Sequence, residues 1–343
     1  MGRVVDKVAV VGAGSWGTTV ASIAVRGAPT VLWARRAELA DAINATNENP
    51  DYLPGVALPG GLRATASLEE AVSGAGLVIM AVPSHGFRAV LADLAPSVAA
   101  DAAVLSLTKG LEQGTHRRMT EVVAAVLPGH CAGVLSGPNL AREIVAGQPA
   151  ATVVAMTDPG TARSVQRLLG TDTFRVYTNP DVVGCEVAGA TKNVLAIAAG
   201  ISAGLGLGDS SMAALITRGL AELGRLGVAM GGHRLTIAGL AGVGDLVATC
   251  TSALSRNRAV GVELGRGRAL DDVVGEMRMV AEGVKTARPL LDMAAELGVE
   301  MPIGEQVDLV LQGSQPPSAV VPALMRRTAK SEFEGLEPAR RAP

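Results

Sequence analysis

Aromatic residues are scarce in this chain, with two Trp, two Tyr and three Phe among 343 residues. Single-stranded nucleic acids bind proteins largely by stacking bases on aromatic rings, and so few rings provide no such platform. The formal net charge is -2, so a broad cationic surface for nucleic acids is not expected either. The composition therefore predicts no nucleic-acid partner.

Cysteine is also rare. Cys131, Cys185 and Cys250 are far apart, odd in number and without the spacing of metal ligands. We expect them to be reduced core residues of a cytoplasmic protein, with no metal site and no disulfide.

Long hydrophobic runs are missing as well. The most apolar later stretch, residues 194–207, is about 14 residues long and follows Lys192 and Asn193, whereas a membrane-spanning helix needs about 20. The N-terminus enters a strand within a few residues, so it has no room for a signal peptide, and Asp6 stands where a myristoylation signal needs Ser or Thr. We expect no membrane insertion.

Apolar residues are abundant, at 48%, and the length allows two domains. The first part alternates strand-like and helix-like segments, which predicts an α/β fold with a doubly wound, mostly parallel Rossmann-like sheet. Residues 44–61, with three prolines, are expected to form a loop before the third strand. The predicted strands are 8–11, 30–34, 62–65, 77–82, 103–107, 133–136, 151–156 and 174–177.

Helical periods replace this alternation from about residue 179. We predict a dinucleotide-binding domain over residues 1–182, an all-helical substrate and catalytic domain over 183–329, and a flexible tail over 330–343. The predicted helices are 184–200, 210–230, 246–250, 255–265, 283–297 and 304–311.

A glycine-rich motif, GAGSWG at 12–17, follows the first strand and opens a helix-like segment. Gly12 permits a tight turn, Gly14 lets the backbone approach a pyrophosphate, and Gly17 lets the helix lie against the strand. The pattern favours dinucleotide binding over an ordinary strand-to-helix turn.

The second strand ends in Arg35 and Arg36, without the carboxylate that NAD sites use for the ribose 2′-hydroxyl. Two guanidinium groups suit a 2′-phosphate, so NADP(H) is favoured, with NAD(H) left open. The alternative is a solvated basic turn that opens the next helix.

Lys109 directly follows a buried strand, where ligands of open parallel sheets gather, and either meets an anionic ligand or is an ordinary loop lysine. Lys192 is more informative because its helix is apolar on nearly every side. A buried ammonium needs a partner or a task, unless its long stem carries it to solvent.

Two later segments carry further polar groups. Asp245 follows a glycine-rich turn and either acts in the site or caps the next helix. Ser255, Arg256 and Asn257 suit a phosphate at a helix start; the alternative is Ser255 as an N-cap followed by two exposed arginines, Arg256 and Arg258.

Together these segments resemble the bacterial NAD(P)H-dependent glycerol-3-phosphate dehydrogenases over residues 7–328. The order of the lysine helix, the GDL turn and SRNR is far more specific than the glycine-rich motif. The matching segments are GAGSWG at 12–17, VPSH at 82–85, TKGLE at 108–112, SGPN at 136–139, FRVYTNPD at 174–181, AGATKNVLAIAAG at 188–200, ALITRGLAE at 214–222, AGVGDLVATC at 241–250, SRNR at 255–258 and VAEGVKT at 280–286.

The resemblance implies a helical domain like the C-terminal domain of 6-phosphogluconate dehydrogenase, with Lys192 as the general acid/base. Many relatives have Ser or Thr where this chain has Asn139, which leaves its role open. The implied substrate-binding residues are Lys109, Gly137, Asn139, Lys192, Asp245, Ser255, Arg256 and Asn257. The implied cofactor-binding residues are Gly12, Gly14, Ser15, Trp16, Gly17, Arg35, Arg36, Lys109, Ala141, Arg256, Val280 and Glu282.

The implied reaction converts dihydroxyacetone phosphate to sn-glycerol 3-phosphate, a precursor of phospholipids. Two alternatives remain: another two-domain hydroxyacid or 3-hydroxyacyl-CoA dehydrogenase with His85 as the acid/base, and a non-catalytic NADP(H)-sensing protein. A helix-rich second domain often associates, which suggests a homodimer.

Overall fold

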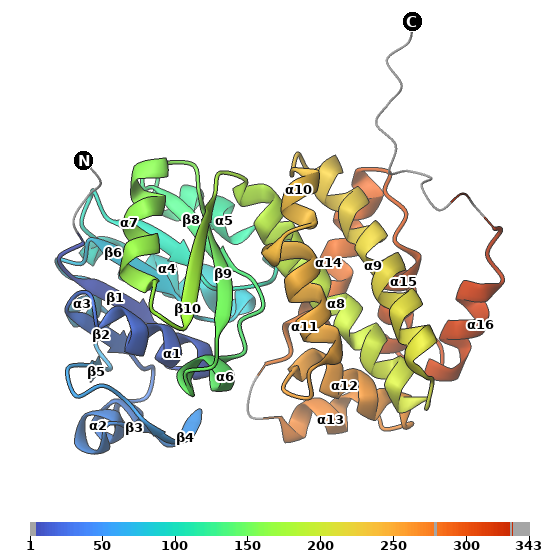
Figure 1. Cartoon of the computed structure of the whole chain (residues 1–343), viewed down its shortest axis with the longest axis horizontal. Coiled ribbons are helices and arrows are strands. Elements are labelled where there is room, and N and C mark those ends of the chain that lie inside the picture. Colours follow the sequence, from blue (N-terminus) through green and yellow to red (C-terminus); the bar gives the residue numbers. More distant parts are fainter. Residues whose placement is uncertain (1–4, 278–279, 330, 332–343) are drawn as a thin grey trace, which may run out of the picture. The chain divides into compact units, whose positions relative to one another are not determined.

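The computed structural model describes residues 5–277, 280–329 and 331 (Figure 1). The chain divides between Glu186 and Val187 into two units, called unit 1 and unit 2 below. Apart from Ser331, the tail predicted over 330–343 lies outside the described residues.

Unit 1 contains an eight-stranded sheet in the order β10-β9-β8-β7-β6-β1-β2-β5. All neighbouring strands are parallel except β8 and β9, which confirms the predicted doubly wound, mostly parallel sheet. The strands are β1 (Val8–Val11), β2 (Thr30–Trp33), β5 (Arg63–Thr65), β6 (Leu77–Met80), β7 (Ala103–Ser106), β8 (Ala132–Ser136), β9 (Ala150–Met156) and β10 (Phe174–Asn179).

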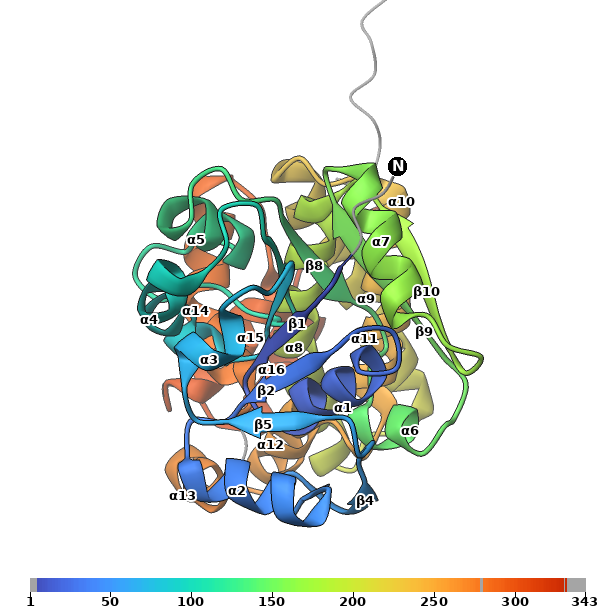
Figure 2. The same cartoon turned by 90° about the vertical axis from the view of Figure 1, so that its left-hand side faces the viewer.

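Helices cover both faces of this sheet, as Figure 2 shows. Val8 and Val10 of β1 pack into one apolar cluster while Ala9 and Val11 pack into the other, because successive side chains of a strand point to opposite faces. The first cluster includes α1 (Ser15–Ala24), α2 (Ala37–Thr46), α6 (Ala141–Val145) and α7 (Pro159–Leu169); the second includes α3 (Leu68–Val72), α4 (Ser84–Leu94) and α5 (Met119–Val126). A short 3₁₀ turn, η1 (Ala95–Ser97), follows α4.

The strand order reverses at β1, since β2 and β5 lie on one side of it and β6 to β10 on the other. In open α/β sheets ligands bind beyond the carboxyl ends of the strands at such a point. The glycine-rich motif directly follows β1, so the topology places it at this position.

The predicted loop over residues 44–61 is wrong. Helix α2 continues to Thr46, and β3 (Glu48–Asn49) then pairs antiparallel with β4 (Leu53–Ala57) in a separate two-stranded sheet. Prolines are tolerated here because each strand of a two-stranded sheet has an unpaired edge.

Unit 2 is helical throughout its described residues, as the sequence predicted. Helix α8 begins before the boundary between the units and is the longest element. The helices are α8 (Val182–Gly204), α9 (Asp209–Ala229), α10 (Arg234–Ile237), α11 (Asp245–Thr251), α12 (Arg256–Gly265), α13 (Leu270–Glu276), α14 (Glu282–Glu296), α15 (Pro302–Leu311) and α16 (Val320–Met325), with a π-helical turn η2 (Leu240–Gly244) and a 3₁₀ turn η3 (Pro317–Ala319). The short helices α10, α13 and α16 were not predicted, because a few residues show no clear period.

Helices α8 and α12 pack backbone against backbone through four glycines. A Cβ on Gly200 would lie 2.1 Å from the Arg258 carbonyl oxygen, and one on Gly261 would lie 2.1 Å from that of Ile197. One turn further, Gly204 and Gly265 repeat the pattern. Only glycine permits this approach, which brings Lys192 on α8 into the same helix pair as residues 256 and 257 on α12.

By length and composition α8 could span a membrane, with a mean hydropathy of 1.3 over its most apolar window. However, 94% of that window is buried inside the protein, which is typical of a core helix. The helix is therefore buried, as predicted, although it is longer than the apolar stretch identified from the sequence.

Candidate active site

The three glycines of the 12–17 motif are not all required by the packing of the chain. Gly12 has a φ of 120° and a Cβ there would lie 2.6 Å from the Ala81 carbonyl oxygen, while a Cβ on Gly17 would lie 2.0 Å from that of Gly12. A Cβ on Gly14, in contrast, would meet nothing within 4 Å. The packing of the chain therefore requires glycine at positions 12 and 17 but not at position 14.

This open space at Gly14 fits a dinucleotide. Gly14 is the N-cap of α1 and has no side chain that could accept a hydrogen bond from the first N–H groups of the helix. Such N–H groups and the positive end of the helix dipole attract phosphate. Glycine therefore stands at a position where the protein's own packing does not need it.

Ser15 and Trp16 lie half-buried in the first turn of α1. The Ser15 hydroxyl donates to the Tyr52 carbonyl oxygen at 2.8 Å. The Trp16 indole packs edge-on against Phe174 with the ring centroids 6.2 Å apart, and its buried Nε1 has no acceptor among the described residues. An unpartnered buried donor beside the motif offers a hydrogen bond to a ligand.

Arg35 and Arg36 are exposed at the carboxyl end of β2. Arg36 forms an ion pair with Asp51, while Arg35 forms none with any residue of the described part of the chain. The sequence analysis did not identify Asp51.

Four predicted site residues lie beyond the carboxyl ends of β7 and β8, and two of them, Lys109 and Gly137, are in contact. Lys109 is half-buried and its Nζ donates to the Gly137 carbonyl oxygen at 2.8 Å. Asn139 donates through Nδ2 to Thr152 Oγ1 at 3.0 Å, and its buried Oδ1 has no donor among the described residues. Ala141 follows as the half-buried first residue of α6. Lys109 is therefore held in place and is not a solvated loop lysine.

Lys192 is buried in unit 2 and forms an ion pair. Its Nζ donates to Asp245 Oδ1 at 2.8 Å and to Thr249 Oγ1 at 2.6 Å. The two charged side chains are 8% and 2% exposed. The alternative that Lys192 reaches solvent is therefore wrong.

Asp245 is the first residue of α11 and Gly244 is the N-cap, so Asp245 does not cap this helix. A π-helical turn, η2, precedes it, and a Cβ on Gly242 of this turn would lie 1.9 Å from the Ile237 carbonyl oxygen. Thr249 lies one helical turn after Asp245 and donates to the Asp245 backbone oxygen at 2.6 Å. The tight turn and this hydrogen bond fix the carboxylate against Lys192.

Thr249 and Asn193 belong to the site geometry, and the sequence analysis missed both. Thr249 is four residues after Asp245, a spacing that puts both side chains on one helix face, and Asn193 is adjacent to Lys192. These spacings are the signals that would have found them.

Asn257 joins three helices of unit 2. Its Nδ2 donates to Asn193 Oδ1 at 2.9 Å, and its Oδ1 accepts from the Gly283 backbone N–H at 2.9 Å. These contacts link α12 to α8 and α14 and leave one N–H and one lone pair of the amide for other partners.

Ser255 is the N-cap of α12, with its hydroxyl accepting from the Arg258 N–H at 3.2 Å. The alternative predicted from the sequence was Ser255 as an N-cap followed by two exposed arginines, and the N-cap is confirmed. It is only partly correct for the arginines, because Arg256 is exposed whereas Arg258 is half-buried. Val280 and Glu282 are half-buried near the start of α14.

The predicted residues thus form two groups, one in each unit. The unit 1 group is Gly12, Gly14, Ser15, Trp16, Gly17, Arg35, Arg36, Lys109, Gly137, Asn139 and Ala141; the unit 2 group is Lys192, Asp245, Ser255, Arg256, Asn257, Val280 and Glu282. The described residues contain no group of three or more His, Cys, Asp or Glu side chains that could hold a metal ion.

His85, the acid/base of the alternative enzyme, is exposed in the first turn of α4. Within the described ranges no carboxylate hydrogen-bonds to its ring. A catalytic base normally has a third group that orients it, which Lys192 has and His85 lacks.

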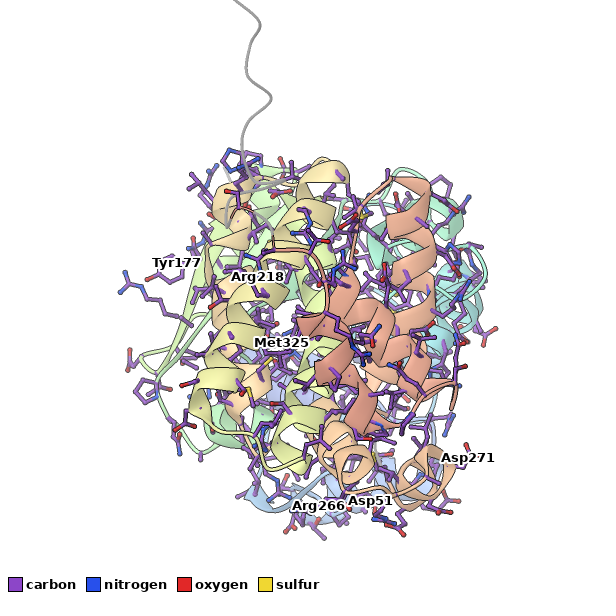
Figure 3. All side chains as sticks on the ribbon, turned by 90° about the vertical axis from the view of Figure 1, so that its right-hand side faces the viewer. Asp51, Tyr177, Arg218, Arg266, Asp271 and Met325 are labelled. Atoms are coloured by element: carbon purple, nitrogen blue, oxygen red, sulfur yellow. The ribbon has the colours of Figure 1, made fainter. Side chains whose placement is uncertain are left out.

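A cavity of about 1410 Å³ lies elsewhere in unit 2, lined by parts of α8, α9, α10, α15 and α16. Figure 3 shows the right-hand side of Figure 1 and labels two of the residues that line this cavity, Arg218 and Met325. None of the predicted site residues lines it, so it is not the candidate active site.

The open glycine-rich turn and the buried lysine together define a class, the oxidoreductases that combine a dinucleotide-binding domain with a helical domain. Residues 7–162 match the family described as NAD-dependent glycerol-3-phosphate dehydrogenase N-terminus, and residues 181–322 match the corresponding C-terminus. The chain belongs to the NAD-dependent glycerol-3-phosphate dehydrogenase family, which confirms the resemblance seen in its motifs.

Individual relatives agree. The chain is 53% identical over 330 residues to an NAD(P)+-dependent glycerol-3-phosphate dehydrogenase of Sphingopyxis alaskensis, with 96% of both chains covered. It is 52% identical to one of Geobacter sulfurreducens, covering 95% of this chain and 99% of the relative. The crystal structure of glycerol-3-phosphate dehydrogenase from Coxiella burnetii superposes with a TM-score of 0.90 at 38% identity, covering 94% and 99%. The predicted fold class is confirmed.

Proposed function

We propose that this chain interconverts dihydroxyacetone phosphate and sn-glycerol 3-phosphate with NAD(P)H, and that it supplies glycerol 3-phosphate for phospholipid synthesis. The observation that carries the proposal is the buried Lys192 with its partners Asp245 and Thr249, in a chain of this family. We also propose a cytoplasmic location, supported by three free cysteines, and a homodimer, supported only by the helix-rich unit 2.

Lys192 is the proton donor in this proposal. When bound, the reduced nicotinamide supplies a hydride to the carbonyl carbon of the substrate, and negative charge grows on the carbonyl oxygen. A lysine ammonium has three N–H bonds, of which Asp245 and Thr249 accept two, so one remains for that oxygen. The same N–H stabilises the growing charge and then transfers its proton.

Asp245 and Thr249 keep the ammonium in one position before the substrate arrives. Their oxygens accept from Lys192 in a water-poor environment, where hydrogen bonds to a charged group are strong. In the oxidative direction Lys192 accepts the proton that the alcohol releases. Oxidation of glycerol 3-phosphate is therefore favoured by higher pH.

The remaining predicted substrate residues would bind the substrate phosphate and orient the reacting end. The Arg256 guanidinium, at the N-terminus of α12, can clamp the substrate phosphate with help from Ser255. Lys109, Gly137, Asn139 and Asn257 would orient the reacting end, since binding energy from the phosphate is used for positioning.

For the cofactor, the bare backbone around Gly14 would receive the pyrophosphate and the Arg35 and Arg36 side chains the 2′-phosphate. Ser15, Trp16, Ala141, Val280 and Glu282 complete the proposed set, and the unpartnered Trp16 Nε1 is its clearest free donor.

An assay of NADPH oxidation tests the function. We expect turnover with dihydroxyacetone phosphate and little with dihydroxyacetone or acetoacetyl-CoA. Lys192→Met should lower kcat by about 10³-fold or more, since general acid catalysis and charge stabilisation are lost together. His85→Ala should leave kcat nearly unchanged.

The opposite result, with His85 essential and Lys192 dispensable, would favour a hydroxyacid or 3-hydroxyacyl-CoA dehydrogenase. NADPH binding without oxidation by any small phosphorylated ketone would favour the sensing protein.

A further inference from the structure

A carboxylate lies at the point where the sequence showed only cations. Asp51 stands in the turn between β3 and β4, and its Oδ2 accepts from an N–H of the Arg36 guanidinium. Arg36 is the N-cap of α2, directly after the end of β2. The carboxylate raises the pKa of Arg36 above its usual value through this hydrogen bond. The pair is therefore part of the region that receives the adenosine ribose in this type of fold.

This turn is fixed to the glycine-rich motif. Asn49 is fully buried, and its Nδ2 donates to the Ala13 carbonyl oxygen at 2.9 Å and to Thr18 Oγ1 at 2.8 Å. Its Oδ1 accepts from the Tyr52 N–H at 3.1 Å, and the Tyr52 carbonyl oxygen accepts from Ser15. Residues on both sides of Asp51 are thus held by the segment that carries the motif, so the position of its backbone is determined.

The two arginines consequently differ. Arg36 is already paired with a carboxylate, and the two side chains are 52% and 39% exposed. A 2′-phosphate that uses Arg36 must compete with Asp51, and it meets the negative charge of that carboxylate as well. Arg35, with no ion pair in the described part of the chain, carries no such cost.

The carboxylate has the opposite effect on NAD(H). NAD sites use a carboxylate at the end of the second strand to accept a hydrogen bond from the ribose 2′-hydroxyl. This chain has no carboxylate at the tip of β2, but the β3–β4 turn brings one to the guanidinium that follows β2. Arg36 and Asp51 therefore provide one group suited to each cofactor.

We propose that Asp51 is a specificity-determining residue that lowers the preference for NADP(H) over NAD(H) by pairing with Arg36 and by offering an acceptor to a free 2′-hydroxyl. The proposal rests on the proposed function, which makes a nicotinamide nucleotide the cofactor. It predicts that the ratio of the two affinities, rather than either affinity alone, depends on Asp51.

Equilibrium binding of NADPH and NADH, followed by the fluorescence of the reduced nicotinamide, tests it without turnover. In Asp51→Asn we expect the Kd of NADPH to fall about fivefold, the scale of an exposed ion pair, and the Kd of NADH to stay or rise. Asp41→Asn is the matched control, because Asp41 is an exposed carboxylate of α2 with no ion pair among the described residues. It should leave the ratio unchanged.

A second comparison measures the effect of Asp51→Asn in an Arg36→Ala background, where the gain in NADPH affinity should be clearly smaller because Arg36 is no longer there to be released. The proposal is overturned if Asp51→Asn leaves the affinity ratio within twofold, or if Asp41→Asn shifts it equally. Failure of wild-type protein to bind either nucleotide would instead overturn the proposed function.

Discussion

At the scale of single residues, Lys192 is the proposed catalytic residue, and burial and charge oppose each other there. Removing an ammonium from water costs several kcal/mol unless other groups compensate. Asp245 supplies the opposite charge and Thr249 a second acceptor, both from α11. Removing either partner leaves a charge incompletely compensated, so the site depends on all three side chains.

Thr249→Val tests this dependence with little change in shape. It removes the acceptor 2.6 Å from Lys192, and a hydrogen bond to a charged group contributes about 1.5–3 kcal/mol. We expect kcat to fall by about tenfold or more, with the KM for dihydroxyacetone phosphate and the Kd of NADPH nearly unchanged. Thr249→Ser should recover most of the activity. A folded Thr249→Val protein with kcat within twofold of wild type would show that Thr249 does not position Lys192.

At the scale of elements, the glycine contacts between α8 and α12 bring the helix of the proposed catalytic lysine close to the proposed phosphate-binding helix. Each glycine faces a carbonyl oxygen or the backbone of the other helix, at distances where no other residue fits. The glycines repeat at four-residue spacing on both helices, so the contact extends over more than one turn.

Gly200→Ala should therefore separate the two helices. A Cβ 2.1 Å from the Arg258 carbonyl oxygen forces backbone movement, and overpacking of this kind costs about 1–3 kcal/mol. We expect a lower midpoint in urea unfolding and a loss of kcat.

Gly275→Ala is the control, since it also lies in a helix but its Cβ would meet nothing within 4 Å. It should be neutral or slightly stabilising. Equal midpoints for the two variants would contradict the packing argument.

At the scale of the whole molecule, buried carboxylates make stability depend on pH. Burial raises the pKa values of Glu186, Glu222 and Asp308 above their usual range. Glu222 is the clearest case: it accepts the N–H groups of Ile303 and Gly304 at the start of α15, and its pKa is raised to about 7. Protonation of these groups favours the folded state.

The direction of the pH dependence follows from the linkage between proton binding and folding. Below the unfolded pKa of about 4.3 the stabilisation from Glu222 is fully present, and it is lost as pH rises through the folded value near 7, by at most about 4 kcal/mol. In Glu222→Gln the side chain is neutral at every pH, so the Tm should fall less between pH 5 and 8 than in wild type. The control is Glu296→Gln, an exposed glutamate whose replacement should not alter the slope. Parallel curves for wild type and Glu222→Gln would refute the assignment.

Much of this architecture is local and could be predicted. Short apolar runs predicted the strands and the helical period of 3.6 residues predicted the long helices, because both patterns are properties of neighbouring residues in the chain. Lys192 was identified because its helix is apolar on nearly every side and carries no further charge at three- or four-residue spacing from it. Its partners could not be assigned, since Asp245 and Thr249 are more than fifty residues away and are brought to it by packing.

The sequence by itself determined the order of a nucleotide-binding domain and a helical domain, the glycine-rich turn, and the lysine that requires a partner. Only the tertiary structure decided that Asp245 and Thr249 are those partners, that residues 48–57 form a hairpin, and that Asp51 faces Arg36. The physical reason is that propensity and period act between neighbours in the chain. Pairing of charges and contacts of buried polar groups depend instead on which distant segments the core brings together.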